Sequence, residues 1–147
     1  MEEALYSELG FFNTDNVRSS EKGDFLTSPE VSKYFGVIIR SWIDSKNFHE
    51  NIVELGSGTG SLIEQIGLKN ITAVELSSTA RKVIHNKGIL SVKSYEDLNI
   101  LSADLVYGNE ILDNIPCSIG VYKENDWYEK VVDISKDDLS YAYQPIR

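Results

Sequence analysis

Two acidic residues and three glycines follow one another at spacings that suit a nucleotide site. The glycines alternate at Gly56, Gly58 and Gly60, directly after an apolar run that ends at Leu55. Glycines after a buried strand allow a tight turn in which no side chain separates the backbone from a ligand. Glu75 lies 19 residues beyond Gly56, where an acid at the end of the next strand can accept hydrogen bonds from ribose hydroxyls. The pattern predicts a nucleotide-type cofactor at the carboxyl end of a doubly wound sheet.

The glycine spacing separates two classes of cofactor. A dinucleotide site of the form G-x-G-x-x-G needs glycine or alanine at position 61, and Ser61 stands there instead. Glu54 precedes the turn, and its charge would repel a pyrophosphate in a partly desolvated cleft. A sulfonium with a zwitterionic amino-acid tail tolerates that carboxylate. E-x-G-x-G-x-G with a ribose-binding acid is the hallmark pattern of class I methyltransferases that use S-adenosyl-L-methionine (SAM). SAM is the predicted cofactor, and a nicotinamide-dependent oxidoreductase is the less favoured alternative.

Other residues are predicted to complete the cofactor site, and each has a structural alternative. Tyr95, Glu96 and Asp97 occupy the usual place for groups that stack on adenine and bind its amino group, but a solvated acidic turn explains them too. The glycine turn could serve only to pack a helix onto a strand, and Glu75 could be an ordinary surface residue. The predicted cofactor-binding residues are Glu54, Gly56, Ser57, Gly58, Gly60, Glu75, Leu76, Tyr95, Glu96 and Asn109. No metal site is predicted, because His49 and His85 lack metal-ligand spacing.

The elements that must position these residues alternate between strands and helices. Apolar runs predict strands at about 51–56, 71–76, 89–93 and 103–108. Short helices are predicted from about Gly60, and from Ser77 or Ser78 to a left-handed cap at Gly88. This alternation predicts an α/β, Rossmann-like fold with right-handed βαβ units and a parallel sheet.

Apolar residues at helical spacing also predict one continuous helix before the first strand. It begins either with a capping box of Thr27 and Glu30 or with Ser28 as the cap and Pro29 in the first position, and it continues to Ile43. Residues 13–23 are predicted to form a loop. After Pro116, runs at 119–123 and 128–134 predict an antiparallel hairpin around residues 124–127, and the polar tail from 135 to 147 has only a weak pattern.

Composition limits the function classes. The 147 residues are predicted to form one domain, with a cover segment and helix at 1–50, a βαβ core at 51–116 and a hairpin and tail at 117–147. A net charge of −9 argues against non-specific binding to nucleic acid. No run of residues is long and apolar enough for a membrane span, and the acidic start does not match a signal peptide. With a single cysteine, this predicts a soluble cytoplasmic protein.

The motifs together resemble one family. The chain is similar to the MidA-like class I methyltransferases, whose mitochondrial members assist the assembly of respiratory complex I by methylating an arginine. Order and spacing agree from residue 4 to about 132. The matching segments are residues 4–6, 23–30, 35–36, 53–60, 74–75, 109–113 and 115–116, together with Trp127, Glu129 and Val132.

The resemblance also exposes a difference in length. Family members are usually more than twice as long, and class I methyltransferases normally have seven strands, of which this chain supplies four and a hairpin. Such a partial sheet exposes an apolar edge. A truncated chain, a second chain that completes the sheet, and self-association are three explanations that remain open.

The residues after the fourth predicted strand are candidates for catalysis. Asn109, Glu110 and Asp113 lie at the carboxyl edge of the sheet, where ligands bind in α/β folds. Methyl transfer to nitrogen needs an aligned acceptor, and acidic side chains can orient a guanidinium or ammonium group. We expect Glu110 and Asp113 to orient a cationic acceptor and Asn109 to line the methyl site. The alternative is that these residues cap the following turn.

The sequence therefore predicts a SAM-dependent methyltransferase, or its SAM-binding part, that acts on a protein side chain such as arginine. A non-catalytic SAM-binding or assembly module is the alternative. The resemblance places residues 27–30 over the cofactor as a cover, although helix capping explains the same residues.

Overall fold

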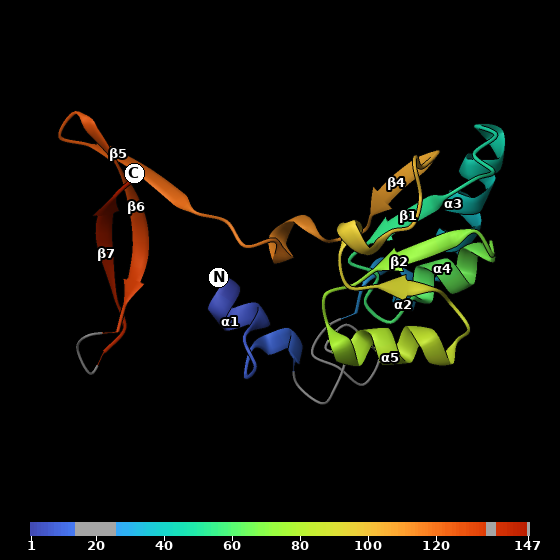
Figure 1. Ribbon diagram of the computed structural model, residues 1–147, viewed down its shortest axis with the longest axis horizontal. Helices are drawn as coiled ribbons and strands as arrows, with labels where there is room; N and C mark the ends of the chain where they lie inside the picture. The colour runs from blue at the N-terminus through green and yellow to red at the C-terminus, as the bar shows by residue number, and fades with distance from the viewer. Residues whose placement is uncertain (14–25, 135–137, 147) are drawn as a thin grey trace. The chain divides into compact units, whose positions relative to one another are not determined.

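The computed structural model describes residues 1–13, 26–134 and 138–146, which divide into two units, Met1–Ile115 and Pro116–Arg147. The first unit is built on four parallel strands in the order β3-β2-β1-β4 (Figure 1). Their bounds are β1 Ile52–Leu55, β2 Ile71–Val74, β3 Ser91–Val92 and β4 Leu105–Gly108. The predicted parallel sheet is confirmed, with strands shorter than their apolar runs.

Two helices connect these strands as predicted. Helix α4, Ser61–Ile66, buries the three apolar residues that its sequence offers, Leu62, Ile63 and Ile66. Helix α5, Ser78–Asn86, begins after Ser77, whose Oγ accepts a hydrogen bond from the backbone N–H of Ala80 at 3.3 Å. Gly88 follows α5 with φ +74°, which confirms the predicted left-handed end of that helix.

One face of the sheet carries the core of this unit. Alternate residues of a strand point to opposite faces, so Ile52 and Ala73 lie on the same side as Leu105. Helices α3, α4 and α5 cover that side. The buried cluster consists of Ile43, Ile52, Leu62, Ile63, Ile66, Ile71, Ala73 and Ile84. On the opposite face, Val106 of β4 is 54% exposed. Val53 of β1 lies on that face too and is buried, so the opposite face is covered at β1 and open at β4.

The segment before β1 departs from the prediction of a single helix. It forms two helices, α2 Ser28–Val31 and α3 Lys33–Ser45. Ser32 between them is extended, with φ −150° and ψ 123°, and its Oγ accepts a hydrogen bond from the backbone N–H of Tyr34 at 3.3 Å. The prediction of a single helix was wrong because Ser32 leaves the helical conformation and acts as the N-cap of α3. The capping box of Thr27 and Glu30 at the start of α2 is confirmed.

Gln65 of α4 holds both of these helices. Its Nε2 donates to the carbonyl oxygen of Pro29 at 2.6 Å, and its Oε1 accepts from the backbone N–H of Gly36 at 3.2 Å. A β-carbon on Gly36 would lie 2.3 Å from Cβ of Gln65. Glycine at this position therefore lets α3 approach α4 closely.

The first residues of the chain contain two short elements that the sequence pattern did not reveal. They are α1, Glu2–Tyr6, and a 3₁₀ helix η1, Phe11–Asn13. The rings of Tyr6 and Phe12 stack with their centroids 5.5 Å apart. The predicted loop at 13–23 lies outside the described residues after its first residue.

The second unit is a small antiparallel sheet in the order β5-β6-β7, with β5 Ile119–Lys123, β6 Asp126–Asp133 and β7 Ser140–Pro145. The predicted hairpin is confirmed. Its turn is shorter than predicted, because Glu124 and Asn125 alone form it, with φ 53° and 64°. Strand β7 lies in the weakly patterned tail, where the sequence analysis predicted no element.

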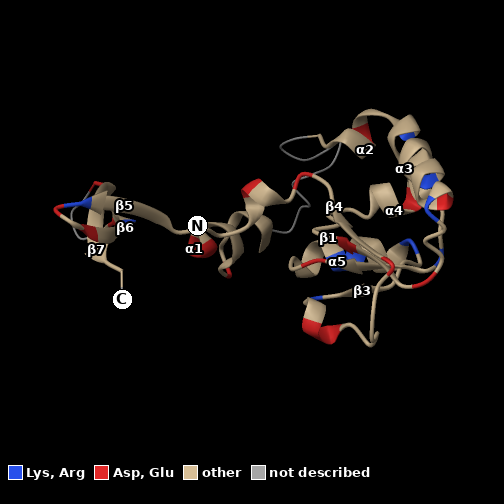
Figure 2. Ribbon diagram, turned by 90° about the horizontal axis from the view of Figure 1, so that it is seen from above, with Lys and Arg blue, Asp and Glu red and all other residues tan. Residues whose placement is uncertain are grey.

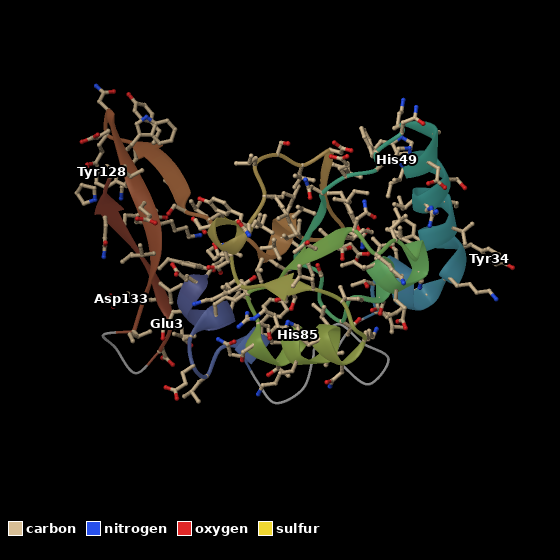
Figure 3. All side chains as sticks on the ribbon, turned by 45° about the vertical axis from the view of Figure 1, so that its right-hand side comes forward. Glu3, Tyr34, His49, His85, Tyr128 and Asp133 are labelled. Carbon is tan, nitrogen blue, oxygen red and sulfur yellow. The ribbon has the colours of Figure 1, made fainter. Side chains whose placement is uncertain are left out.

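Among the described residues, no helix combines the length and hydropathy needed to cross a lipid bilayer. The basic residues in Figure 2 are spread over several elements, including α3 and α5. Across the part of the chain that the structure describes, no group of three or more potential ligands could hold a metal ion. Figure 3 shows His85 on α5 and His49 in the segment that follows α3.

Candidate functional site

The glycine turn joins β1 to α4 at the carboxyl edge of the sheet. Gly56, Gly58 and Gly60 all have positive φ, at 65°, 53° and 73°. Such angles are easy for glycine and strained for other residues. The Oγ of Ser57 donates to the carbonyl oxygen of Glu54 at 3.2 Å and closes the turn. The α-carbon of Gly60 faces the core, since a β-carbon there would lie 3.3 Å from Cγ1 of Ile84.

Glu75 reaches across to this turn from the end of β2. Its Oε2 accepts a hydrogen bond from the backbone N–H of Gly58 at 2.9 Å, and its Oε1 accepts from that of Ser77 at 2.8 Å. The guanidinium of Arg81 donates to the carbonyl oxygens of Glu75 and Leu76, each at 2.7 Å. Burial raises the pKa of Glu75, and the two N–H donors and Arg81 act in the opposite direction. The structure thus brings Glu75 to the glycine turn and fixes its orientation.

Glu54 is the most unusual group in the site. Its side chain is 3% exposed, and its Oε2 has no hydrogen-bond partner among the described residues. Burial raises its pKa to about 8, and the nearby charges of Glu75 and Glu30 add to this effect, whereas a hydrogen bond from Ser57 lowers it. A buried carboxyl group with an unsatisfied oxygen indicates a position where a cationic partner would be stabilised.

Tyr107 of β4 is a neighbour of Glu54 that the sequence analysis missed. The two residues are paired in the register of β4 and β1, so their side chains lie on the same face. The hydroxyl of Tyr107 is also buried without a partner in the described part of the chain. Its pKa is raised by burial and by the charge of Glu54. The period of two along 103–108, aligned with the strand at 51–56, was the signal that could have found it.

Glu110 lies in the loop after β4 and has a positive φ of 53°. Its Oε1 accepts hydrogen bonds from the backbone N–H and the Oγ of Ser28, both at 2.9 Å, and from Nδ2 of Asn109 at 3.1 Å. The backbone N–H of Ser28 is the largest cause of a lowered pKa for Glu110. The structure therefore brings Asn109 and Glu110 together and links both to α2.

Asp113 lies farther along, in the 3₁₀ turn η3, Leu112–Asn114, and is exposed. Its Oδ1 accepts from Nδ2 of Asn114 at 3.2 Å, and the same Nδ2 donates to the carbonyl oxygen of Glu110 at 3.1 Å, so Asn114 bridges the two residues. The hydroxyl of Tyr6 donates to the carbonyl oxygen of Asn114 at 2.8 Å. Burial raises the pKa of Tyr6, followed by the charges of Glu75 and Asp113. Tyr6 is thus a residue near both predicted halves of the site.

Residues before β1 also bind the glycine turn. The Oε1 of Glu30 accepts a hydrogen bond from Oγ1 of Thr59 at 3.1 Å, while its Oε2 serves the backbone and the hydroxyl of Thr27. The Oγ of Ser77 donates to the carbonyl oxygen of Phe12 at 2.7 Å. Helix capping and contact with the turn are therefore combined in one residue, Glu30.

Ile111 connects the two loops by packing and was not predicted. A β-carbon on Gly56 would lie 2.7 Å from its Cδ1, and one on Gly108 would lie 2.9 Å from its Cγ2. The missing side chains of two glycines make room for this isoleucine. Periodicity along the sequence does not predict this contact, because the contact joins two loops.

The remaining predicted residues lie on exposed surface. Leu76 follows Glu75 and is partly exposed. Tyr95 and Glu96 belong to a 3₁₀ turn η2, Tyr95–Asp97, in which Tyr95 is 69% exposed. The backbone N–H of Glu96 donates to Oγ of Ser94 at 3.4 Å. The hydrogen bonds given for this turn lie within residues 94–98 and do not reach the glycine turn.

The chain is similar to several curated proteins. It is 31% identical over 133 residues to the human mitochondrial protein arginine methyltransferase NDUFAF7, covering 79% of this chain and 28% of that protein. It is 28% identical over 180 residues to the Caenorhabditis elegans homolog, covering 93% of this chain and 41% of that protein. The chain thus spans less than half the length of these relatives. No family model matches it.

One solved structure gives the fold. A superfamily member from Burkholderia thailandensis, crystallised with S-adenosyl-homocysteine, superimposes with a TM-score of 0.75 at 21% identity. The match covers 99% of this chain and 44% of that one. The predicted Rossmann-like class I methyltransferase fold, reduced to its first four strands and a hairpin, is confirmed.

The comparisons correct one prediction. The cytoplasmic location inferred from composition is wrong, because the curated relatives are mitochondrial proteins. A lone cysteine and the lack of an apolar span fit any reducing compartment, so they could not distinguish one from another.

Sequence motifs, curated relatives and fold agree with one another. The predicted resemblance to the MidA-like class I methyltransferases is thereby confirmed, over most of this chain and less than half the length of its relatives.

Proposed function

We propose that this chain is the SAM-binding part of a protein methyltransferase. The observation that carries the proposal is the pairing of Glu75, fixed by the backbone of Gly58, with the buried carboxyl group of Glu54 beside the same turn. One acid can accept hydrogen bonds from ribose hydroxyls, and the other can face a positively charged group. A sulfonium nucleoside with an amino-acid tail carries both features.

The residues present fit this cofactor. The backbone of Gly56, Ser57 and Gly58 would hold the methionine and ribose portions, Glu75 the ribose hydroxyls, and Glu54 the positive charge. Leu76, Tyr95 and Glu96 stay proposed contacts of the adenine. The bound cofactor would supply the methyl group, and the chain itself has to align the acceptor and exclude water.

We propose that the acceptor is a positively charged side chain of a protein, such as an arginine. Glu110 is held as a carboxylate by Ser28 and Asn109, which suits it to orient such a group. In this arrangement Asn109 lines the methyl site, and Asp113 adds negative charge farther out. The human and nematode relatives are named as protein arginine methyltransferases, which supports the same acceptor class.

Calorimetric titration with S-adenosyl-homocysteine, SAM and NAD tests the cofactor proposal. We expect both sulfur nucleosides to bind and NAD to give no heat. NAD binding alone would support the nicotinamide alternative. Absence of binding by all three, in a protein that unfolds cooperatively, would overturn the proposal.

A non-catalytic assembly module is the second candidate, and the open edge of the sheet favours it. Strand β4 pairs with β1 on one side, and no described strand pairs with its other side. Exposed strand edges bind further strands, so we propose that a second copy or a second chain completes the sheet there. Light scattering gives the molar mass of the purified protein in solution and so distinguishes a monomer from a dimer of this chain. A monomer that transfers methyl groups without any partner would contradict the module and the completed sheet together.

A further inference from the structure

A groove is lined by residues of α2 and α3, by Leu26 and Thr27 before them, and by Glu110. Its volume is about 450 Å³, within the range of about 300–1,000 Å³ typical of ligand sites. Leu26, Val31, Tyr34 and Ile38 give it an apolar lining, and all four are more than half exposed. Figure 3 shows Tyr34 projecting outward from α3. The groove therefore presents apolar surface that the described residues of the first unit leave exposed.

Glu110 adds a negative charge to this apolar lining. In the part of the chain that the structure describes, the three hydrogen bonds of its side chain all end on Oε1. Oε2 is therefore the oxygen that can receive an incoming cation. The lowered pKa of Glu110 keeps it ionised at neutral pH. An apolar surface with one fixed carboxylate complements a ligand that has an apolar part and one positive charge.

The groove is also connected to the proposed cofactor site. The residue after Glu110, Ile111, packs against Gly56 of the glycine turn, and Glu30 of α2 accepts a hydrogen bond from Thr59 of the same turn. A cation held at Glu110 is thus bound by a residue whose neighbour touches the cofactor loop. This relationship favours an acceptor segment over an unrelated ligand.

We propose that the groove binds a segment of the substrate protein in which an apolar side chain lies beside the positively charged residue to be methylated, with Glu110 receiving the charge and Tyr34 and Ile38 the apolar side chain. The inference rests on the proposed function. It gives the substrate a recognisable local sequence, an arginine or lysine next to a large aliphatic residue. It also makes Ile38 a residue that determines specificity.

Short fluorescent peptides test this inference by anisotropy, with S-adenosyl-homocysteine at saturation. The probes carry a central arginine flanked on either side by leucine, and matched probes replace leucine by serine, or arginine by lysine or by neutral citrulline. We expect the serine and citrulline probes to bind about tenfold more weakly, as the loss of one buried aliphatic side chain or one charged hydrogen bond implies. The lysine probe shows which cation is preferred.

Protein variants locate the binding surface. We expect Ile38→Ser to weaken the leucine probe about tenfold, and Val37→Ser, on the same helix but outside the groove lining, to leave it unchanged. In Glu110→Gln, the arginine and citrulline probes should bind equally. The inference is overturned if the protein binds S-adenosyl-homocysteine but binds all the peptide probes equally, and Ile38→Ser changes none of these affinities. The proposed function would stand in that case. If the protein binds no S-adenosyl-homocysteine, the proposed function fails first.

Discussion

Cδ1 of Ile111 lies 2.7 Å from the point where a β-carbon on Gly56 would stand. Gly56 has a φ of 65° as well, so both its conformation and its surroundings require glycine. Ile111 directly follows Glu110, the proposed acceptor-binding residue, and Gly56 is the first residue of the proposed cofactor turn. The two loops of the site are therefore in direct contact.

The first prediction concerns this contact. Gly56→Ala adds backbone strain and a steric clash, each of which costs on the order of 1–3 kcal/mol. We expect the free energy of unfolding, measured with urea, to fall by about 2 kcal/mol or more. Gly88→Ala is the control, since it has a similar φ and no atom within 4 Å, and it should cost only the strain. Ile111→Ala should recover the clash part of the loss in the Gly56→Ala background. A loss no larger than that of Gly88→Ala would contradict the contact.

The second prediction tests the ribose-binding role of Glu75. Glu75→Ala removes a charged hydrogen-bond acceptor, worth about 1.5–3 kcal/mol, so affinity for S-adenosyl-homocysteine should fall by roughly ten- to hundredfold. Glu75→Gln keeps one acceptor for Gly58 or Ser77 and should lose less. Calorimetry gives both values. Glu64→Gln, at an exposed ion pair with Lys87, is the control and should bind normally. Equal affinities for all three variants would exclude Glu75 from the site.

The third prediction is a pH dependence of stability caused by Glu54. Its folded pKa of about 8 is above the ordinary value of 4.5, so the folded chain keeps a proton that the unfolded chain releases. The free energy of unfolding should therefore decrease as the pH rises from about 4.5 to about 8. Glu75, whose pKa is also raised, contributes with the same sign. Glu54→Gln should make the melting temperature depend less on pH in this window. An unchanged slope would show that Glu54 titrates normally in the fold.

The fourth prediction concerns the buried cluster to which α3 contributes. Ile43 of α3 is fully buried, and Ile43→Ala should lower the free energy of unfolding by about 2–5 kcal/mol through lost burial and a cavity. Val37→Ala, at an exposed position of the same helix, should change it by less than about 0.5 kcal/mol. Guanidinium titration followed by circular dichroism measures both. Similar losses for the two variants would mean that α3 is packed differently.

The sequence predicted the parallel sheet because its strands and helices carry strong local signals. It failed at Ser32, since Val31 continues the apolar spacing of α3 although it is 71% exposed. Periodicity cannot distinguish a buried apolar residue from an exposed one. It did not reveal β7, in which no residue is fully buried and no buried face imposes alternation.

The site shows the same division between local and distant information. Glu54, the glycines and Glu75 were found because motif spacing along the chain reflects the geometry of a βαβ unit. Ile111 and Tyr107 were missed because their roles depend on contacts between strands or loops that are remote in sequence. The hydrogen bonds from Ser28 to Glu110, 82 residues apart, belong to the same class.

The side-chain amide of Gln65 links three helices of the first unit. It forms hydrogen bonds with the backbone of Pro29 in α2 and Gly36 in α3, and it belongs to α4, the helix that starts at the glycine turn. The same two helices supply most of the lining of the groove. Through Gln65, the helix that follows the proposed cofactor turn is thus hydrogen-bonded to both helices that line the groove.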